Sequence, residues 1–148
     1  MNDLVIEPFT PADQMAACAV ILAGLEERWG VLDPSLNPDL DDIATHYAAG
    51  VFLVARLGGA LVGTGALIPE GKGIGRIVRM SVVRRLRRRG IGTRILCALL
   101  DAARRSGYHT LVLETTETWD DAIAFYLSYG FRIVERRGGD VHFEMPLR

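Results

Sequence analysis

The chain passes from a predicted strand into a predicted helix at Arg87-Arg88-Arg89-Gly90-Ile91-Gly92. Residues 77–83 before this junction are rich in β-branched side chains, and residues 93–106 after it have helical periodicity. Glycines let the backbone approach a ligand closely, and the first N–H groups of a helix are unpaired and lie at the positive end of its dipole. The arginines add guanidinium donors that match phosphate geometry. The junction therefore predicts a binding site for a cofactor that carries a diphosphate.

Two familiar phosphate-binding motifs do not fit this junction. A dinucleotide fingerprint requires a third glycine at the position of Ile95, and a Walker loop requires a Gly-Lys-Ser/Thr sequence that does not follow. The junction instead resembles the [Gln/Arg]-x-x-Gly-x-[Gly/Ala] signature of the GNAT superfamily of N-acetyltransferases. Residues 121–131, Asp-Ala-Ile-Ala-Phe-Tyr-Leu-Ser-Tyr-Gly-Phe, resemble the family's helix Ala-Ile-x-[Leu/Phe]-Tyr-x-x-x-Gly-Phe, in the expected order. The resemblance covers residues 50–148 by motif and the first 50 residues by overall pattern.

Hydrophobic patterning predicts one domain of the α/β or α+β class over residues 1–148. The resemblance implies a GNAT-like fold, in which a central mixed sheet is flanked by helices and closed by a β-hairpin. Thr10 is predicted to cap the first helix, with Pro11 at its first position and Asp13 as the capping partner. The predicted strands are 4–7, 51–56, 60–68, 77–83, 110–115, 131–136 and 141–145, the helices 11–28, 39–49, 93–106 and 120–129, the loop 30–38 and the turn 69–75.

Length and composition are those of an ordinary globular protein. The 148 residues are 49% hydrophobic and 24% charged, and a net charge of −1 disfavours a general nucleic-acid binder. No apolar stretch reaches about 18 residues, and the first residues lack the pattern of a signal peptide. Cys18 and Cys97 are predicted to be buried small hydrophobes. We expect a cytoplasmic protein, monomeric or homodimeric, without nucleic-acid or membrane partners and without a bound metal.

The resemblance implies that acetyl-CoA is the cofactor and acetyl donor. In the family, backbone groups of the strand before the signature pair with the pantetheine arm, and a main-chain N–H there binds the thioester oxygen. The matching strand end is Met80-Ser81-Val82, with Met80 or Val82 as the contact. Trp119 departs from the family pattern, because many members have a cofactor-contacting asparagine there. The residues of the signature turn that would hold the diphosphate are Arg87, Arg88, Arg89, Gly90, Ile91, Gly92 and Thr93.

Acetyl transfer to an amine requires a base for the ammonium group and an acid for the departing thiolate. Tyr126 matches the family tyrosine that protonates the thiolate, and its unperturbed pKa of about 10 is close to that of an alkyl thiol. Glu114 lies twelve residues upstream, the separation at which ribosomal-protein N-terminal acetyltransferases of the family carry the glutamate that acts as base. The alternatives are a packed helix tyrosine and an edge carboxylate that pairs with an arginine or caps the loop before Asp120.

Three further residues are candidates for the acceptor side. Arg76 occupies the position at which the histone-acetylating branch of the family carries its glutamate, so that branch's chemistry is disfavoured. Arg76 or Arg79 would anchor the carboxylate of an amino-acid-like acceptor; the alternatives are an ion pair with Glu114 or Glu144, or simple exposure. Trp29 would line the acceptor pocket, or else belong to the core or to a surface flap.

These features predict an acetyl-CoA-dependent N-acetyltransferase whose acceptor is the primary amine of a small molecule or of an amino-acid-like compound. The amine attacks the thioester directly in a ternary complex, with Glu114 as base and Tyr126 as acid. A protein N-terminal acetyltransferase and a non-catalytic acyl-CoA-binding module are the alternatives. An arginine-rich nucleic-acid binder is disfavoured by the net charge and by the scarcity of aromatic residues beside residues 84–89.

Overall fold

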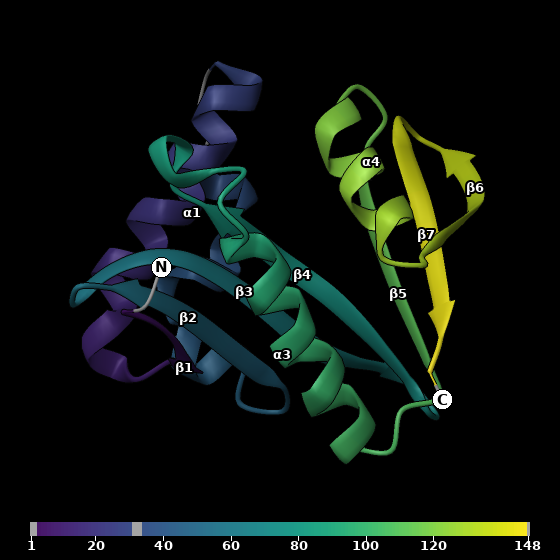
Figure 1. Cartoon of the computed structure of the whole chain (residues 1–148), viewed down its shortest axis with the longest axis horizontal. Helices are drawn as coiled ribbons and strands as arrows, with labels where there is room; N and C mark the ends of the chain where they lie inside the picture. Colours follow the sequence, from purple (N-terminus) through teal and green to yellow (C-terminus); the bar gives the residue numbers. More distant parts are fainter. Residues whose placement is uncertain (1–2, 31–33, 148) are drawn as a thin grey trace.

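Seven strands form one mixed sheet in the computed structural model, which describes residues 3–30 and 34–147 (Figure 1). The strand order is β1-β2-β3-β4-β5-β7-β6, and β4 and β5 form its parallel pair, which confirms the expected mixed sheet with a closing hairpin. The strands are β1 (Leu4–Pro8), β2 (Val51–Leu57), β3 (Ala60–Gly71), β4 (Ile74–Val82), β5 (Thr110–Thr116), β6 (Arg132–Arg137) and β7 (Asp140–Pro146). The α-helices are α1 (Gln14–Trp29), α2 (Ile43–His46), α3 (Ile91–Arg105) and α4 (Asp120–Ser128), and the 3-10 turns are η1 (Pro11–Asp13), η2 (Pro34–Leu36), η3 (Pro38–Asp41) and η4 (Arg84–Leu86).

Strands β4 and β5 lie side by side over a short distance only. Their parallel pairing joins residues 74–76 of β4 to residues 110–112 of β5, and the later residues of the two strands are not paired with each other. Figure 1 shows the two strands diverging from the end of the sheet near the C-terminus. The sheet is thus split into an N-terminal part, β1–β4, and a C-terminal part, β5–β7, which also carries α4.

Helices α1 and α3 cover opposite faces of the N-terminal part. Successive residues of a strand point to opposite faces, and β2 shows this alternation clearly. Phe52 and Val54 belong to the core cluster that contains Ile21 of α1. Leu53 and Ala55 belong to the larger cluster formed with α3. The central sheet is therefore buried on both faces in this part of the molecule.

The helical periodicity predicted for residues 93–106 is confirmed, and it gives α3 a buried apolar stripe. Its four residues are at most 1% exposed: Ile91, Ile95, Leu99 and Ala103. Helix α3 can pack closely on β3 because residue 65 is a glycine. A Cβ at this position would lie only 2.6 Å from Ile95 Cγ2 and 2.7 Å from Met80 Sδ. Helix α3 thus lies directly on the backbone of β3, and its first turn is held at the opening between β4 and β5.

The predicted cap of the first helix is confirmed, and the second predicted helix is wrong. Thr10 N donates to the Asp13 carboxylate at 3.0 Å, and a 3-10 turn follows and continues into α1. In place of a helix over 39–49 the chain forms η3 and the four-residue α2. The break lies at Asp42, whose backbone is not helical and whose side chain accepts a hydrogen bond from Thr45 N and so caps a new helix.

Some predicted boundaries move by a few residues. In the loop expected over 30–38, residues 31–33 lie outside the described part of the chain, and η2 and η3 supply short 3-10 turns. Strands β3 and β4 extend into the turn expected over 69–75 and are joined by a tighter turn, in which Gly73 has a φ of 71°. Helix α3 begins at Ile91, two residues before its predicted start.

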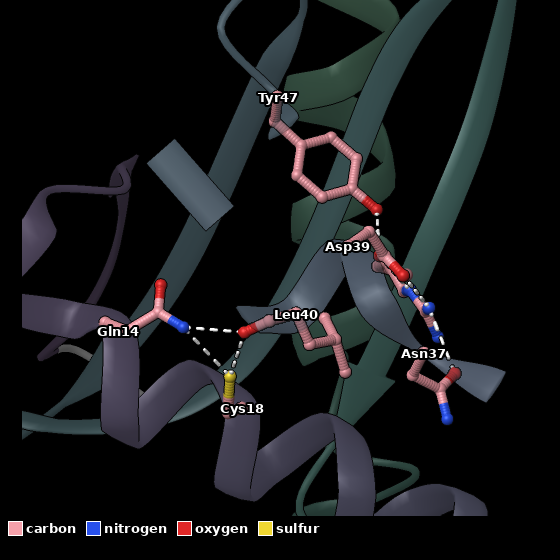
Figure 2. A network of polar contacts seen from close by, with 7 residues as sticks. Gln14, Cys18, Asn37, Asp39, Leu40 and Tyr47 are labelled. Atoms are coloured by element: carbon pink, nitrogen blue, oxygen red, sulfur yellow. Dashed lines mark hydrogen bonds and ion pairs between the residues drawn. The ribbon is translucent and has the colours of Figure 1, made fainter. Parts of the chain in front are cut away.

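The two cysteines lie in different surroundings. Cys18 is half-buried on α1 and, with Gln14, donates to the carbonyl oxygen of Leu40, which ties η3 to α1 (Figure 2). Cys97 is exposed, because its position on α3 falls outside the apolar stripe, so the prediction of a buried residue is wrong. Across residues 3–30 and 34–147, no helix is long and apolar enough to cross a bilayer, and no cluster of His, Cys, Asp and Glu is arranged to hold a metal ion.

We expect Gly65→Ala to lower the free energy of unfolding by about 1–3 kcal/mol, because the added methyl group would force α3 away from β3. Urea denaturation measures this change. Gly71→Ala on the same strand is the matched control, since a Cβ there meets no atom within 4 Å. Equal stability of the two variants would show that α3 does not rest on the β3 backbone as described.

Candidate active site

A cleft of about 640 Å³ opens where β4 and β5 separate. We call it the β4–β5 cleft. Its walls come from the diverging ends of both strands, from α1, from the first turn of α3 and from α4. The structure brings all the predicted site residues to this cleft except Arg76, Arg89 and Trp29. Segments from four parts of the sequence thus meet at one opening in the sheet.

The first turn of α3 forms one end of the β4–β5 cleft. Arg88 and Gly90 have left-handed backbone conformations, with φ of 63° and 83°, and Gly90 caps the helix. The first hydrogen bond of this turn runs from Arg94 N to Gly90 O, so the amides of residues 91–93 have no carbonyl partner within α3. These amides coincide with the positive end of the helix dipole, and the turn can therefore bind an anionic group such as a diphosphate.

The arginines of this turn differ in their contacts. Arg87 Nη1 forms an ion pair with Glu27 of α1 at 2.7 Å, and Arg87 Nε donates to Val82 O at 3.1 Å. Arg88 is exposed and lines the cleft, whereas Arg89 is exposed outside it. Arg87 therefore fastens the turn to α1 and β4, and Arg88 is the guanidinium that is free to reach a bound anion.

Tyr126 lies on the α4 side of the cleft. Its ring packs against Phe125, Phe131 and Phe143, and the residue is 8% exposed. Its hydroxyl makes no hydrogen bond with any residue that the structure describes. Burial raises the pKa of the Tyr126 phenol well above its ordinary value of 10. A thiol in the same dry surroundings also has a raised pKa, because burial disfavours its charged form as well.

Glu114 stands between the β4–β5 cleft and a second, smaller cavity of about 360 Å³. The two cavities share Ile77, Val78, Arg79 and Glu114 as wall residues. The smaller cavity is completed by Asp39, Tyr47 and Ile68. We call it the Asp39 cavity. A carboxylate therefore lies on the boundary between the two spaces, and the Glu114 side chain is 35% exposed there.

Arg76 is held by two carboxylates. Its guanidinium makes two hydrogen bonds to Glu70, at 2.8 and 2.9 Å, and a third to Glu114. The predicted ion pair with Glu114 is therefore present in the structure. One cation faces two acids in this group, so Arg76, Glu70 and Glu114 together carry a net negative charge. A substrate carboxylate would have to displace one of the two acids to reach Arg76.

Arg79 is also paired, with acceptors from the segment before α2. Its guanidinium binds both carboxylate oxygens of Asp39, at 2.7 and 2.9 Å, and Asn37 Oδ1 at 3.1 Å. Tyr47 OH donates to Asp39 Oδ2 at 2.6 Å (Figure 2). Neither predicted acceptor-anchoring arginine is thus free of a protein carboxylate.

Two residues of this network, Asp39 and Tyr47, were not predicted as site residues. Burial raises the pKa of Asp39, but the hydrogen bonds from Arg79 and Tyr47 outweigh it and leave that pKa below its ordinary value. Burial and the neighbouring Asp39 carboxylate raise the pKa of Tyr47 to about 12. Asp39 is therefore an anion and Tyr47 a neutral donor at neutral pH. No local signal marks either residue, because Arg79, the partner of Asp39, lies 40 residues along the chain.

A bridge of side chains joins α1 to α4 beside the β4–β5 cleft. Arg28 makes two hydrogen bonds to the Asp121 carboxylate, at 3.0 and 2.9 Å, and lies 4.4 Å from the ring centroid of Trp119. The rings of Trp29 and Trp119 are 5.6 Å apart, and Trp29 is 57% exposed. Trp29 therefore lies at the surface beside the bridge, whereas Arg28 and Trp119 line the cleft.

Comparison with known proteins supplies an independent finding. A model of the acetyltransferase (GNAT) family matches residues 19–131. The chain is 36% identical over 117 residues to an IAA acetyltransferase of Azospirillum brasilense, covering 78% of this chain and 76% of that protein. It is 34% identical to N-acetyltransferase 8F1 of Rattus norvegicus over 69% of this chain, and it spans about half the length of that relative, 49%. A GNAT-family acetyltransferase of Staphylococcus aureus Mu50 superposes with a TM-score of 0.90 at 21% identity, over 98% of this chain and 99% of that one, which shows a shared fold.

We expect Gly92→Glu to abolish the binding of coenzyme A, because a carboxylate would occupy the anion site at the start of α3. Calorimetric titration with coenzyme A measures the loss. The variant should still fold, since an acidic residue in the first turn of a helix is favourable. Gly92→Ala is the matched control, because a Cβ there would lie at an ordinary contact distance of 3.7 Å from Phe125 Cζ. Undiminished affinity in a folded Gly92→Glu protein would place the diphosphate elsewhere.

Proposed function

The chain belongs to the acetyltransferase (GNAT) family and is an acetyl-CoA-dependent N-acetyltransferase, and from that premise we propose that its acceptor is the primary amine of a small molecule. The observation that supports this proposal is the place of Glu114 on the boundary between the β4–β5 cleft and the Asp39 cavity. Acetyl-CoA supplies the acyl group as a thioester. The β4–β5 cleft receives the donor, and the Asp39 cavity receives the amine.

The residues around the β4–β5 cleft fit the donor. The first turn of α3 offers amides and the Arg88 guanidinium to the diphosphate. The β4 residues Met80, Ser81 and Val82 line the cleft beyond the point where β4 leaves β5, and we assign the pantetheine arm to this side of β4, which has no partner strand. The first turn of α3 and the end of β4 together hold acetyl-CoA, with its thioester directed to the boundary between the two cavities.

Two side chains move protons in the transfer. The Glu114 carboxylate accepts a proton from the acceptor ammonium and so generates the neutral amine that attacks the thioester carbon. The new carbon–nitrogen bond forms as the carbon–sulfur bond breaks, and the Tyr126 hydroxyl donates its proton to the departing sulfur. The amide nitrogen then returns its second proton to the Tyr126 phenolate, and Glu114 releases the ammonium proton to water. The Tyr126 hydroxyl is suited to this role because no described residue holds it and it borders the cleft. Both groups lie on β5 and α4, the elements that follow the opening.

The charges beside Glu114 favour an acceptor without a carboxylate near its amine. Arg76 and Arg79 each pair with protein carboxylates, and Arg76 faces two of them. An ammonium group is therefore attracted to this boundary, while an anionic substituent would meet the negative charge of Glu114. Between the two acceptors foreseen from the sequence, this arrangement supports a simple amine over an amino acid.

We expect Tyr126→Phe to lower kcat roughly ten- to a thousandfold while the affinity for coenzyme A is kept, the range for the loss of one general acid. The melting temperature should be unchanged, because the Tyr126 hydroxyl has no hydrogen-bond partner among the described residues and the ring keeps its aromatic contacts. Full activity of Tyr126→Phe over the whole pH range would mean that Tyr126 serves packing alone.

The proposed reaction is tested by release of the coenzyme A thiol from acetyl-CoA in the presence of paired acceptors, each an amino acid and its decarboxylated amine. We expect the amine to react with the higher kcat/KM. Glu114→Gln should lower kcat/KM at neutral pH and regain activity as the pH rises, because a larger fraction of the acceptor is then neutral without a base.

Glu117→Gln is the matched control for Glu114→Gln. Glu117 is exposed and lines neither cavity, so its substitution should leave the pH profile unchanged. Thiol release with none of the paired acceptors would refute a small-amine acceptor. An unaltered pH profile in Glu114→Gln would show that another group, or water alone, takes the proton.

A further inference from the structure

We propose that Arg79 is a positioning residue, which, through Asp39 and Tyr47, fixes the path of β4 at the point where the two cavities meet. The inference concerns the same reaction and rests on the proposed function for its kinetic consequence. The claim that the network holds the backbone of β4 is supported by contacts within the chain and does not depend on the reaction. Arg79 is not proposed to contact a reacting atom. It acts by holding the backbone of β4 next to it.

The backbone of Arg79 is in an unfavourable conformation. Its φ of 56° lies in the left-handed region, where side chains other than those of glycine, asparagine and aspartate are rare. The pairing of β3 with β4 shifts register at this place, from Thr64 with Ser81 to Ala66 with Val78. Such a shift is a β-bulge, which bends the strand and redirects its side chains. A conformation of this kind persists when its surroundings hold it in place.

Three segments hold this bulge. The buried Thr64 of β3 donates its hydroxyl to Arg79 O at 2.7 Å. On the other side, the guanidinium binds Asp39 through two hydrogen bonds, and Tyr47 fixes the same carboxylate at 2.6 Å. The side chains of Arg79 and Asp39 are only 19% and 12% exposed, so this ion pair is partly shielded from water. Figure 2 shows the Tyr47 hydroxyl directed at the Asp39 carboxylate.

The segment that carries Asp39 is itself anchored. The carbonyl oxygen of the next residue, Leu40, accepts hydrogen bonds from Gln14 and Cys18 of α1, at 2.6 and 3.0 Å. Gln14 also accepts a hydrogen bond from Ile43 N at 3.0 Å (Figure 2 shows the Gln14 and Cys18 contacts). The network therefore ties the β4 bulge to α1 through a short and well-bonded turn.

The position of the bulge gives the network its role. Strand β4 loses its β5 partner after Arg76, so the sheet does not support its later residues from that side. Arg79 is a wall residue of both cavities, and Met80, Ser81 and Val82 directly after it line the β4–β5 cleft. The network takes the place of β5 as the restraint on the backbone of β4 after Arg76. It thereby aligns residues 80–82, which face the thioester, with the Asp39 cavity, which receives the amine.

Arg79→Gly separates positioning from stability. Glycine adopts a φ of 56° readily, so the variant can form the bulge but has no guanidinium to hold it. Asp39→Asn is a second variant, which keeps the size of the side chain and removes its charge. Asp13→Asn is the matched control, because Asp13 also forms a partly buried ion pair, with Arg56 at 2.5 Å, and lines neither cavity.

We expect kcat at saturating substrates to fall roughly ten- to a hundredfold in Arg79→Gly and Asp39→Asn, the loss that a misplacement near 1 Å can cause. The affinity for coenzyme A should change by less than about threefold, because its diphosphate site on α3 is untouched. Asp13→Asn should lower the melting temperature and leave kcat as in the wild type.

Hydrogen–deuterium exchange supplies a readout that needs no acceptor. Uptake by the peptide over residues 76–83 should rise in Arg79→Gly and Asp39→Asn and stay at the wild-type level in Asp13→Asn. Unchanged uptake, or a fall in kcat that Asp13→Asn shares, would overturn the positioning role. If the wild type acetylates no amine, the proposed function fails, and the exchange measurement alone decides whether the network holds β4.

Discussion

The short parallel pairing of β4 with β5 is the constraint on which the rest of the structure depends. Three residues of each strand pair, and the strands then separate. Backbone groups of a strand normally bond to a neighbouring strand, so a strand that leaves its partner presents unused donors and acceptors. The β4–β5 cleft lies at this opening, and the two proposed proton-transfer residues come from elements on its far side.

The elements around the opening are positioned by close packing on the neighbouring strands. Helix α3 reaches the backbone of β3 at Gly63 and Gly65, where a Cβ would lie within 3 Å of Ile95. This contact between α3 and β3 fixes the axis of the helix. The unpaired amides of the first turn of α3 therefore lie at the cleft. Across the opening, Thr93 of α3 and Tyr129 at the end of α4 share a hydrogen bond of 2.6 Å, which sets the distance between the two walls.

Much of the arginine charge near the cleft serves the fold. Arg87 pairs with Glu27, Arg79 with Asp39, and Arg76 with Glu70 and Glu114. A guanidinium that is partly shielded from water needs an acidic partner, because an unpaired buried charge is costly. These pairs neutralise the cations near the transfer site and leave Arg88, on the exposed turn, for the bound anion. The same residue type thus has two uses within a few positions of the chain.

The family, the mixed sheet with its hairpin, the helical periodicity of α3 and the glycine turn before it were predictable from the sequence, because each is encoded in periodicity or in a contiguous motif. The proposed roles of Glu114 and Tyr126 rest on the same kind of signal, their spacing to a recognisable helix. The folded chain alone reveals what Arg76 and Arg79 contact, that Asp39 and Tyr47 belong beside them, and that the helix expected over 39–49 is broken. Those outcomes depend on charges and hydrogen-bond partners that lie tens of residues apart, and no local pattern specifies which distant side chain will meet them once the sheet has split.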